Sequence, residues 1–187
     1  IRALLIDKEK IWYAADQSRF GCIDLKSNQK KEIQIPADKN REYRSIAQTK
    51  EHIFILSVAN PALLYRISKK DLSYELVYQE THEKVFYDSM QFWNDMEGIA
   101  IGDPIEGVFS LLKTIDGGKT WEKTPAKLLP KLVDGEAAFA ASNTNIVVNG
   151  DHTWIVSGGI KARVFYSKDK GKSWSVYNTP IVQGKQM

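Results

Sequence analysis

The sequence predicts an all-β protein assembled from repeated four-stranded antiparallel sheets. Three observations lead to this prediction. First, apolar and polar residues alternate over short segments, and no helical period is sustained. Second, the pattern of strands and turns recurs at intervals of about 42 to 50 residues, which is typical of a radial repeat protein. Third, the octapeptide TIDGGKTW at residues 114–121 returns as SKDKGKSW at residues 167–174.

The repeat can be followed along the chain from its first residue. A small residue followed by an apolar one opens each copy, and a second apolar run follows about seven or eight positions later. Four segments share this pattern: residues 1–25, 43–68, 87–114 and 145–167. An extra apolar segment, AAFAAS, precedes the fourth copy. We therefore predict a β-propeller, a single domain or fragment with about four blades at approximately residues 1–41, 42–84, 85–135 and 136–187.

Within each copy, the first strand is expected to lie at the centre of the ring and the second to fill the space between blades. The first strands should contain Leu4, Ile46, Met90 and Val147, and the second strands Trp12, Phe54 and Trp154. In the fourth copy, Asn149-Gly150 lies between apolar runs. This dipeptide predicts a type I′ hairpin turn, because that turn needs two residues at positive φ.

Both octapeptides fall where the third strand of a copy turns into the fourth. The Asp carboxylate of such a turn can accept hydrogen bonds from backbone N–H groups, and the Gly can adopt a positive φ. The hydroxyls satisfy further backbone groups, and the Trp packs toward the neighbouring blade. We interpret ten residues as structural: Thr114, Asp116, Gly118, Thr120, Trp121, Ser167, Asp169, Gly171, Ser173 and Trp174. Copies one and two lack the Gly-x-Thr-Trp ending, so their hairpins are expected to be degenerate.

The octapeptide resembles the Asp-box, or BNR repeat, of sialidases, related glycoside hydrolases, sortilin-type receptors and propellers like the photosystem II assembly factors. With FWNDMEGIAIGDP and GEAAFAASNT beside it, the chain is similar to secreted bacterial BNR-like proteins, which often carry the label oxidoreductase or glycosyl hydrolase. The resemblance implies a ring of six or seven blades and a secreted or periplasmic location. Because the chain supplies about four blades and begins with Ile1, we expect it to be a piece of a longer protein.

Charged residues at the starts of the first strands are the candidate ligand-binding residues. Arg2, Arg44 and Asp88 hold matching positions in copies one to three, and Glu136 begins the extra segment of copy four. These positions converge on the axial channel of a propeller, where the charges could anchor a polar ligand or pair with one another. A sialidase-like site would also need an arginine triad, a Tyr-Glu pair and an Asp acid/base. The Phe/Tyr-Arg-Ile-Pro motif of that family is absent, and the related YRIS lies in a third strand.

Other chemistries find little support in the sequence. GGKT and KGKS resemble the end of a phosphate-binding loop but lack the earlier glycine. His52, His82 and His152 have no companion at metal-ligand spacing, and the lone Cys22 is typical of a small packing residue. The 26 basic and 23 acidic residues are scattered, which argues against nucleic-acid binding. No apolar run approaches the ~20 residues of a membrane helix, and we predict no metal and no cofactor.

We therefore predict a binding or scaffolding module for a protein or a glycan, rather than an enzyme. The alternative is a sialidase-like glycoside hydrolase with part of its site on further blades, which we favour over an oxidoreductase. The end blades of an open arc would expose apolar residues such as Leu4, Trp12 and Trp154. Exposed apolar faces drive association, so self-association through the blade edges is also expected.

Overall fold

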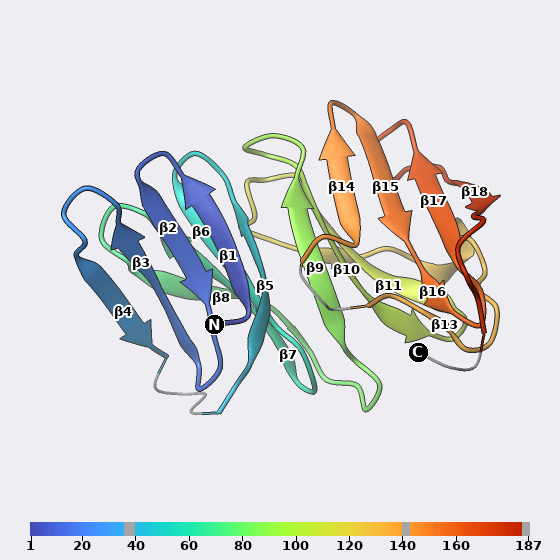
Figure 1. The fold of residues 1–187 in the computed structure, drawn as a ribbon, viewed down its shortest axis with the longest axis horizontal. Coiled ribbons are helices and arrows are strands. Elements are labelled where there is room, and N and C mark those ends of the chain that lie inside the picture. The colour runs from blue at the N-terminus through green and yellow to red at the C-terminus, as the bar shows by residue number, and fades with distance from the viewer. Residues whose placement is uncertain (36–39, 140–142, 185–187) are drawn as a thin grey trace.

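The computed structural model describes residues 1–35, 40–139 and 143–184. It confirms the predicted fold class, because its regular structure is almost entirely β (Figure 1). Within the described residues, a short 3-10 helix, η2 (Ala126–Leu128), interrupts the strands. No helix of the described residues is long and apolar enough to cross a membrane.

Four sheets of four antiparallel strands follow one another in chain order, and each sheet is one blade. Blade 1 contains β1 (Ala3–Asp7), β2 (Lys10–Ala14), β3 (Arg19–Asp24) and β4 (Lys30–Gln34). Blade 2 contains β5 (Tyr43–Gln48), β6 (His52–Ser57), β7 (Ala62–Ser68) and β8 (Tyr74–Glu80). Blade 3 contains β9 (Tyr87–Phe92), β10 (Gly98–Ile105), β11 (Val108–Thr114) and β12 (Glu122–Lys123). Blade 4 contains β14 (Ile146–Asn149), β15 (His152–Val156), β17 (Arg163–Ser167) and β18 (Ser175–Asn178).

A small two-stranded sheet pairs β13 (Glu136–Ala137) with β16 (Gly158–Gly159). The extra apolar segment predicted before the fourth copy begins in β13, and its residues 140–142 lie outside the described residues. This segment leads from blade 3 to the start of blade 4.

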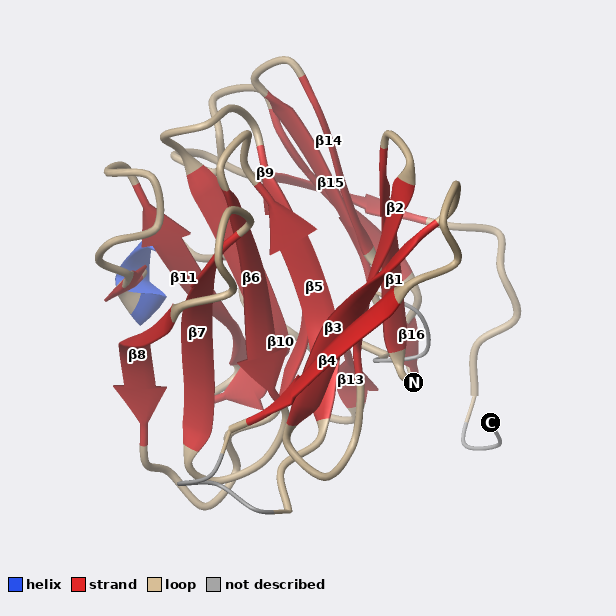
Figure 2. Ribbon diagram, turned by 90° about the vertical axis from the view of Figure 1, so that its left-hand side faces the viewer, coloured by secondary structure: helices blue, strands red, loops and turns tan. Residues whose placement is uncertain are grey.

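The blades stand side by side, with the inner strands β1, β5, β9 and β14 as neighbours. These four strands run in the same direction. Their first residues therefore lie along one edge of the row of blades, and the turns that follow the strands lie along the opposite edge, toward the top of Figure 1. Blades 1 and 4 lie at opposite sides of the molecule in that view. Figure 2, seen from the blade 1 side, shows the sheets as twisted layers behind one another. The described residues therefore form an open arc of blades.

Apolar side chains are buried in three layers, each between two successive blades. Representative members are Trp12, Phe20 and Ile55 between blades 1 and 2, Phe54, Met90 and Trp121 between blades 2 and 3, and Ile101, Ile146 and Phe165 between blades 3 and 4. Each layer buries apolar surface of two blades, and such burial stabilises the folded state by about 25 cal/mol per Å² of buried surface. Stacking of the blades therefore contributes most of the hydrophobic stabilisation.

The outward faces of the end blades lack such a neighbour. Leu4 in β1 is 61% exposed and Val147 in β14 is 53% exposed, although both lie in inner strands as predicted. Trp154 lies in β15 but is only half-buried, because no described residue covers this face of blade 4. Trp12 corrects the expectation of an exposed end residue, since its side chain faces blade 2 and is buried.

Asn143 connects blades 2 and 3 on their inner-strand side. Its Oδ1 accepts hydrogen bonds from Ser45 Oγ at 2.9 Å and from the Met90 backbone N–H at 3.2 Å, and its Nδ2 donates to the Ile46 carbonyl at 2.9 Å. Asn145 next receives a hydrogen bond from Ser89 Oγ. These hydrogen bonds join the residues just before β14 to the inner strands of blades 2 and 3.

Candidate functional site

The first octapeptide forms a closed hydrogen-bonded hairpin between β11 and β12. Asp116 Oδ1 accepts the backbone N–H groups of Lys119 and Thr120, both at 3.0 Å, and Asp116 Oδ2 accepts Thr120 Oγ1 at 2.7 Å. Thr114 Oγ1 donates to Asp116 Oδ1 and accepts the Gly118 N–H. These bonds satisfy the turn from within and occupy most of the acceptor positions of this carboxylate.

The second octapeptide repeats the arrangement between β17 and β18. Asp169 Oδ1 accepts the Lys172 and Ser173 N–H groups at 3.0 and 2.8 Å, and Ser167 Oγ accepts the Gly171 N–H at 2.7 Å. Each tryptophan then packs toward the preceding blade: Trp121 lies with its ring centroid 6.2 Å from that of Phe54 in blade 2, and Trp174 joins the layer between blades 3 and 4.

At the start of the inner strands, Arg2 and Arg44 share one carboxylate. Arg2 Nε lies 2.7 Å from Glu42 Oε1, and Arg44 Nε lies 2.6 Å from the same oxygen. The Arg44 guanidinium also lies over the Phe86 ring, 5.6 Å from its centroid. Arg44 occupies a β-bulge, since Tyr43 pairs with Ser57 and Ser45 pairs with Leu56. A bulge re-aims the side chain that it leaves unpaired.

Asp88 occupies the matching bulge in blade 3, between residues that pair with Gly102 and Ile101. Its side chain is fully buried, and neither carboxylate oxygen has a hydrogen-bond partner among the described residues. Burial, together with the nearby charge of Asp103, raises the pKa of Asp88 to about 8, while Arg44 acts in the opposite direction. Burial also raises the pKa of Asp103 to about 6.

Glu136 is engaged elsewhere. Its carboxylate receives hydrogen bonds from both Arg163 Nε, at 2.9 Å, and Arg163 Nη2, and from Ser157 Oγ at 2.5 Å. Burial alone would raise the pKa of Glu136, but the bonds from Arg163 and Ser157 outweigh it and lower that pKa. The structure therefore gathers Arg2, Arg44 and Asp88 at one end of the inner strands, whereas Glu136 is held by blade 4. Ligand binding by these four residues stays a prediction.

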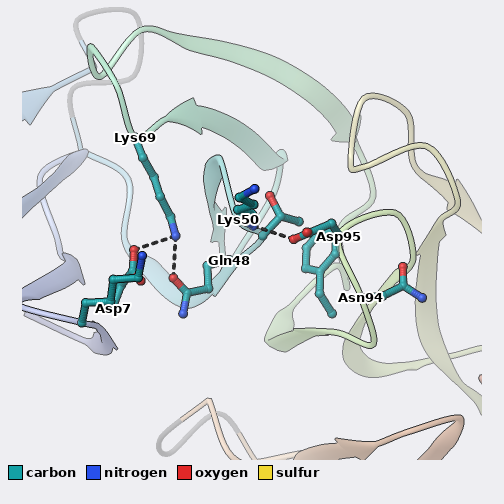
Figure 3. A pocket seen from close by; sticks show the side chains of 9 residues that line it. Asp7, Gln48, Lys50, Lys69, Asn94 and Asp95 are labelled. Atoms are coloured by element: carbon teal, nitrogen blue, oxygen red, sulfur yellow. Dashed lines mark hydrogen bonds and ion pairs between the residues drawn. The ribbon is translucent and has the colours of Figure 1, made fainter.

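A pocket of about 490 Å³ lies at the opposite end of the inner strands, and the sequence did not single it out (Figure 3). We call it the rim pocket. It is lined by residues that follow β1, β5, β7 and β9 in three blades: Asp7, Lys8, Gln48, Thr49, Lys50, Lys69, Phe92, Asn94 and Asp95. The feature of the sequence that could have indicated this pocket is the polar turn that follows the first strand at matching positions in copies one to three.

Two contacts brace the walls of the rim pocket. Lys69 Nζ donates to Asp7 Oδ2 and to Gln48 Oε1, both at 2.7 Å, which joins blade 1 to blade 2 (Figure 3). The Lys50 backbone N–H donates to Asp95 Oδ1 at 2.6 Å, which joins blade 2 to blade 3. Lys8 and Lys50 are exposed, and their ammonium groups form no ion pair within the described part of the chain. The rim pocket thus combines free positive charge with the half-buried ring of Phe92.

The arrangement suits binding better than catalysis. In the described ranges, no three His, Cys, Asp or Glu side chains are grouped to hold a metal ion. The hydrogen bond between His152 Nδ1 and the Tyr166 hydroxyl, at 2.6 Å, belongs to an aromatic stack with Trp154 on the outward face of blade 4. Among its described lining residues, the rim pocket includes no serine, cysteine or histidine.

Comparison with known families identifies the repeat. Residues 67–179 match the family described as photosynthesis system II assembly factor YCF48. The chain belongs to this family. The match spans blades 3 and 4, with both complete Asp-box hairpins, and the last part of blade 2, which confirms the BNR-type repeat. No curated protein sequence matches the chain.

Solved structures with the same fold span all the described blades. Those of U3-55K and of the RRP9 WD40 repeats are 13% and 12% identical, each with a TM-score of 0.68, covering 95% of this chain and 51% of theirs. The structure of YCF48 bound to a D1 peptide is 11% identical, with a TM-score of 0.52, and covers 95% of this chain and 67% of that one. The extracellular domain of BT4673 from B. thetaiotaomicron gives a TM-score of 0.63 at 12% identity, over 98% of this chain and 22% of that one. The chain thus spans about half the length of the first two propellers.

Proposed function

We propose that this chain is a protein-binding propeller module whose rim pocket receives an extended segment of a partner protein. Membership of the assembly-factor family and the D1 peptide bound to the similar YCF48 structure support a peptide ligand. The observation that carries the proposal is the rim pocket itself, where turns from three blades surround a polar opening with one apolar side. Such a mixture of a few oriented polar groups and an aromatic surface is typical of a binding site.

The charge of the rim pocket favours an acidic segment. Asp7 is paired with Lys69, whereas Asp95 accepts only a backbone N–H and keeps its charge, so the ammonium groups of Lys8 and Lys50 outnumber the one carboxylate that remains without a cation among the described residues. A carboxylate of the partner would pair with these groups, while a neighbouring apolar side chain would cover Phe92.

Selection from a phage-displayed random peptide library tests this proposal. We expect enriched peptides to contain Asp or Glu beside an apolar residue, and to bind Lys8→Glu and Lys50→Glu variants at least tenfold more weakly. Lys127→Glu, a matched charge reversal at an exposed residue of η2, should bind as the wild type does. Peptides that are insensitive to both rim variants but lose binding in Trp154→Ser would place recognition on the end face of blade 4 and contradict the proposal.

A second proposal is self-association through the end blades. The outward face of blade 1 exposes Leu4 and Ile6, and that of blade 4 exposes Val147, Val156 and Tyr177. Successive blades already stack face to face in this protein, so the blade 4 face of one copy would pack on the blade 1 face of another. Light scattering should detect oligomers that Trp154→Ser and Ile6→Ser reduce. A monodisperse 21 kDa monomer would contradict this proposal.

A glycan ligand, a sialidase-like hydrolase and a secreted location rest only on the resemblance stated above. Neither the matched family nor the similar structures support hydrolysis. Assay of the protein with a fluorogenic sialoside should therefore give no turnover above the buffer rate, and enzyme-dependent release of the fluorophore would restore the hydrolase alternative.

A further inference from the structure

Two adjacent bulges in blade 3 bring two aspartates together beneath the inner strand. In the pairing of β9 with β10, Ser89 opposes Ile101 and Tyr87 opposes Gly102, so Asp88 has no opposing residue. In the pairing of β10 with β11, Gly102 opposes Ser110 and Pro104 opposes Phe109, so Asp103 is also left over. Bulges of this kind redirect side chains and are frequent beside functional sites.

The two carboxylates lack the donors that a buried charge requires. Both oxygens of Asp88 and Oδ1 of Asp103 are buried with no hydrogen-bond partner in the described residues. Asp103 accepts one hydrogen bond, from the Ala138 backbone N–H. Arg44 is near enough to attract Asp88, but its Nε is bonded to Glu42 at 2.6 Å. An ionised buried carboxylate without a partner is strongly destabilising, so these oxygens need either a proton or a cation.

We propose that Asp88 and Asp103 bind a divalent cation of the Ca²⁺ type at the start of the inner strands. The free ligands are all oxygens, which hard cations prefer, and Asp88 can coordinate through both of its oxygens as Ca²⁺ allows. Only two acidic side chains contribute, so main-chain oxygens and water must complete the coordination. We therefore expect weak binding, with a Kd of about 10⁻⁴ to 10⁻³ M.

Charges on the surrounding elements set the conditions of binding. Arg44 acts on Asp88 from blade 2, and Glu42 pairs with both Arg44 and Arg2. Because its Nε is bonded to Glu42, Arg44 donates no hydrogen bond to Asp88 within the described residues.

Thermal unfolding of the whole chain after chelation, at pH 8.5, tests the site. Addition of CaCl₂ at ten times the Kd should raise Tm by about 3 to 6 °C in a saturable manner. Asp88→Asn and Asp103→Asn should abolish this response. Each should also raise the Tm of the metal-free protein, because each removes a buried unpaired charge. Asp134→Asn, an exposed matched control, should keep the full response.

Isothermal titration with CaCl₂ provides a readout independent of stability. Saturable heat in the wild type and in Asp134→Asn, but in neither site variant, supports the proposal. The proposal is overturned if the wild type shows no saturable binding, which would mean that the pair holds only a proton. It is equally overturned if both site variants bind Ca²⁺ as the wild type does, which would locate the cation elsewhere.

Discussion

Aspartates occupy two contrasting regions of blades 3 and 4. In the outer hairpins, Asp116 and Asp169 each accept hydrogen bonds from two backbone N–H groups and from two hydroxyls. At the start of the inner strands, Asp88 is fully buried and accepts none from the described residues. The same side chain therefore organises one region and destabilises the other.

The pKa values show the physical basis of this difference. Burial pushes the pKa of Asp116 and of Asp169 upward, but hydrogen bonds to the charged form outweigh it, so both fall and that of Asp169 reaches about 2. Burial is not compensated at Asp88 and Asp103, and both pKa values rise. The balance between burial and the number of donors near a carboxylate therefore decides whether its charge stabilises the fold.

The largest expected effect lies in the hairpin region, at Gly118. This residue has a φ of +75°, and an added Cβ would lie 2.2 Å from Phe54 Cε1. Gly118→Ala should therefore lower the free energy of unfolding by about 2 to 5 kcal/mol, from backbone strain and from overpacking of the layer between blades 2 and 3.

Urea denaturation followed by tryptophan fluorescence measures this loss. Gly107→Ala is the matched control, because Gly107 also has a φ of +75° but an added Cβ meets nothing within 4 Å. The control should lose only about 1 to 2 kcal/mol. Equal losses in the two variants would show that Gly118 serves turn geometry alone and that contact with Phe54 is unimportant.

Removal of an aspartate should have opposite effects in the two regions. Asp116→Ala leaves the Lys119 and Thr120 N–H groups without their acceptor, so we expect a loss of about 1 to 3 kcal/mol. In chelated buffer at pH 8.5, Asp88→Asn should instead leave stability unchanged or raise it. The comparison uses chemical denaturation of both variants under the same conditions, and destabilisation by both would mean that Asp88 has a donor after all.

In the metal-free protein, a plot of the free energy of unfolding against pH should show two limbs, one rising at acidic pH and one falling toward pH 8. The pKa of Asp169 is lowered to about 2, so its contribution is present above the ordinary value of 3.8 and is lost as the pH falls toward 2. The pKa of Asp88 is raised to about 8, so the folded state binds more protons than the unfolded state between pH 4 and 8, and stability falls across that range. Asp88→Asn should flatten the falling limb and leave the acidic limb intact. A wild-type profile that stays level between pH 5 and 8 would contradict this.

The sequence predicted the features that depend on local spacing. Asp116, Gly118 and Trp121 are close in the chain, so their turn chemistry can be recognised from the motif, and the repeat period gave the blades. The match of Arg44 with Asp88 was also visible, since equivalent strands begin at equivalent positions. The bulges at these residues were not, because pairing across strands determines which residue is left over.

The binding surfaces depend on contacts between distant residues, and the sequence alone gave no distances for them. Asp103 meets Asp88 only because two bulges adjoin, and the rim pocket exists only because turns of three blades converge. Glu136 aligned with the inner-strand starts, yet Arg163 holds it from a segment later in the chain. Similarly, the hydrogen bonds of Asn143 to blade 2 join residues almost one hundred positions apart.

The smallest expected effect comes from the degenerate hairpin of blade 1. Asp24 Oδ1 accepts the Lys26 and Ser27 N–H groups at 3.0 and 2.9 Å, so the turn keeps its carboxylate although it lacks the Gly and Trp of blades 3 and 4. These bonds are exposed to water, which can replace the carboxylate as acceptor. Asp24→Ala should therefore lower Tm less than Asp116→Ala does, and Asp24→Asn, which keeps an acceptor oxygen, should lower it less still. Thermal unfolding by circular dichroism measures all three variants. A Tm loss in Asp24→Ala as large as that in Asp116→Ala would mean that the aspartate turn alone, without the tryptophan seam, accounts for the stabilisation of a blade.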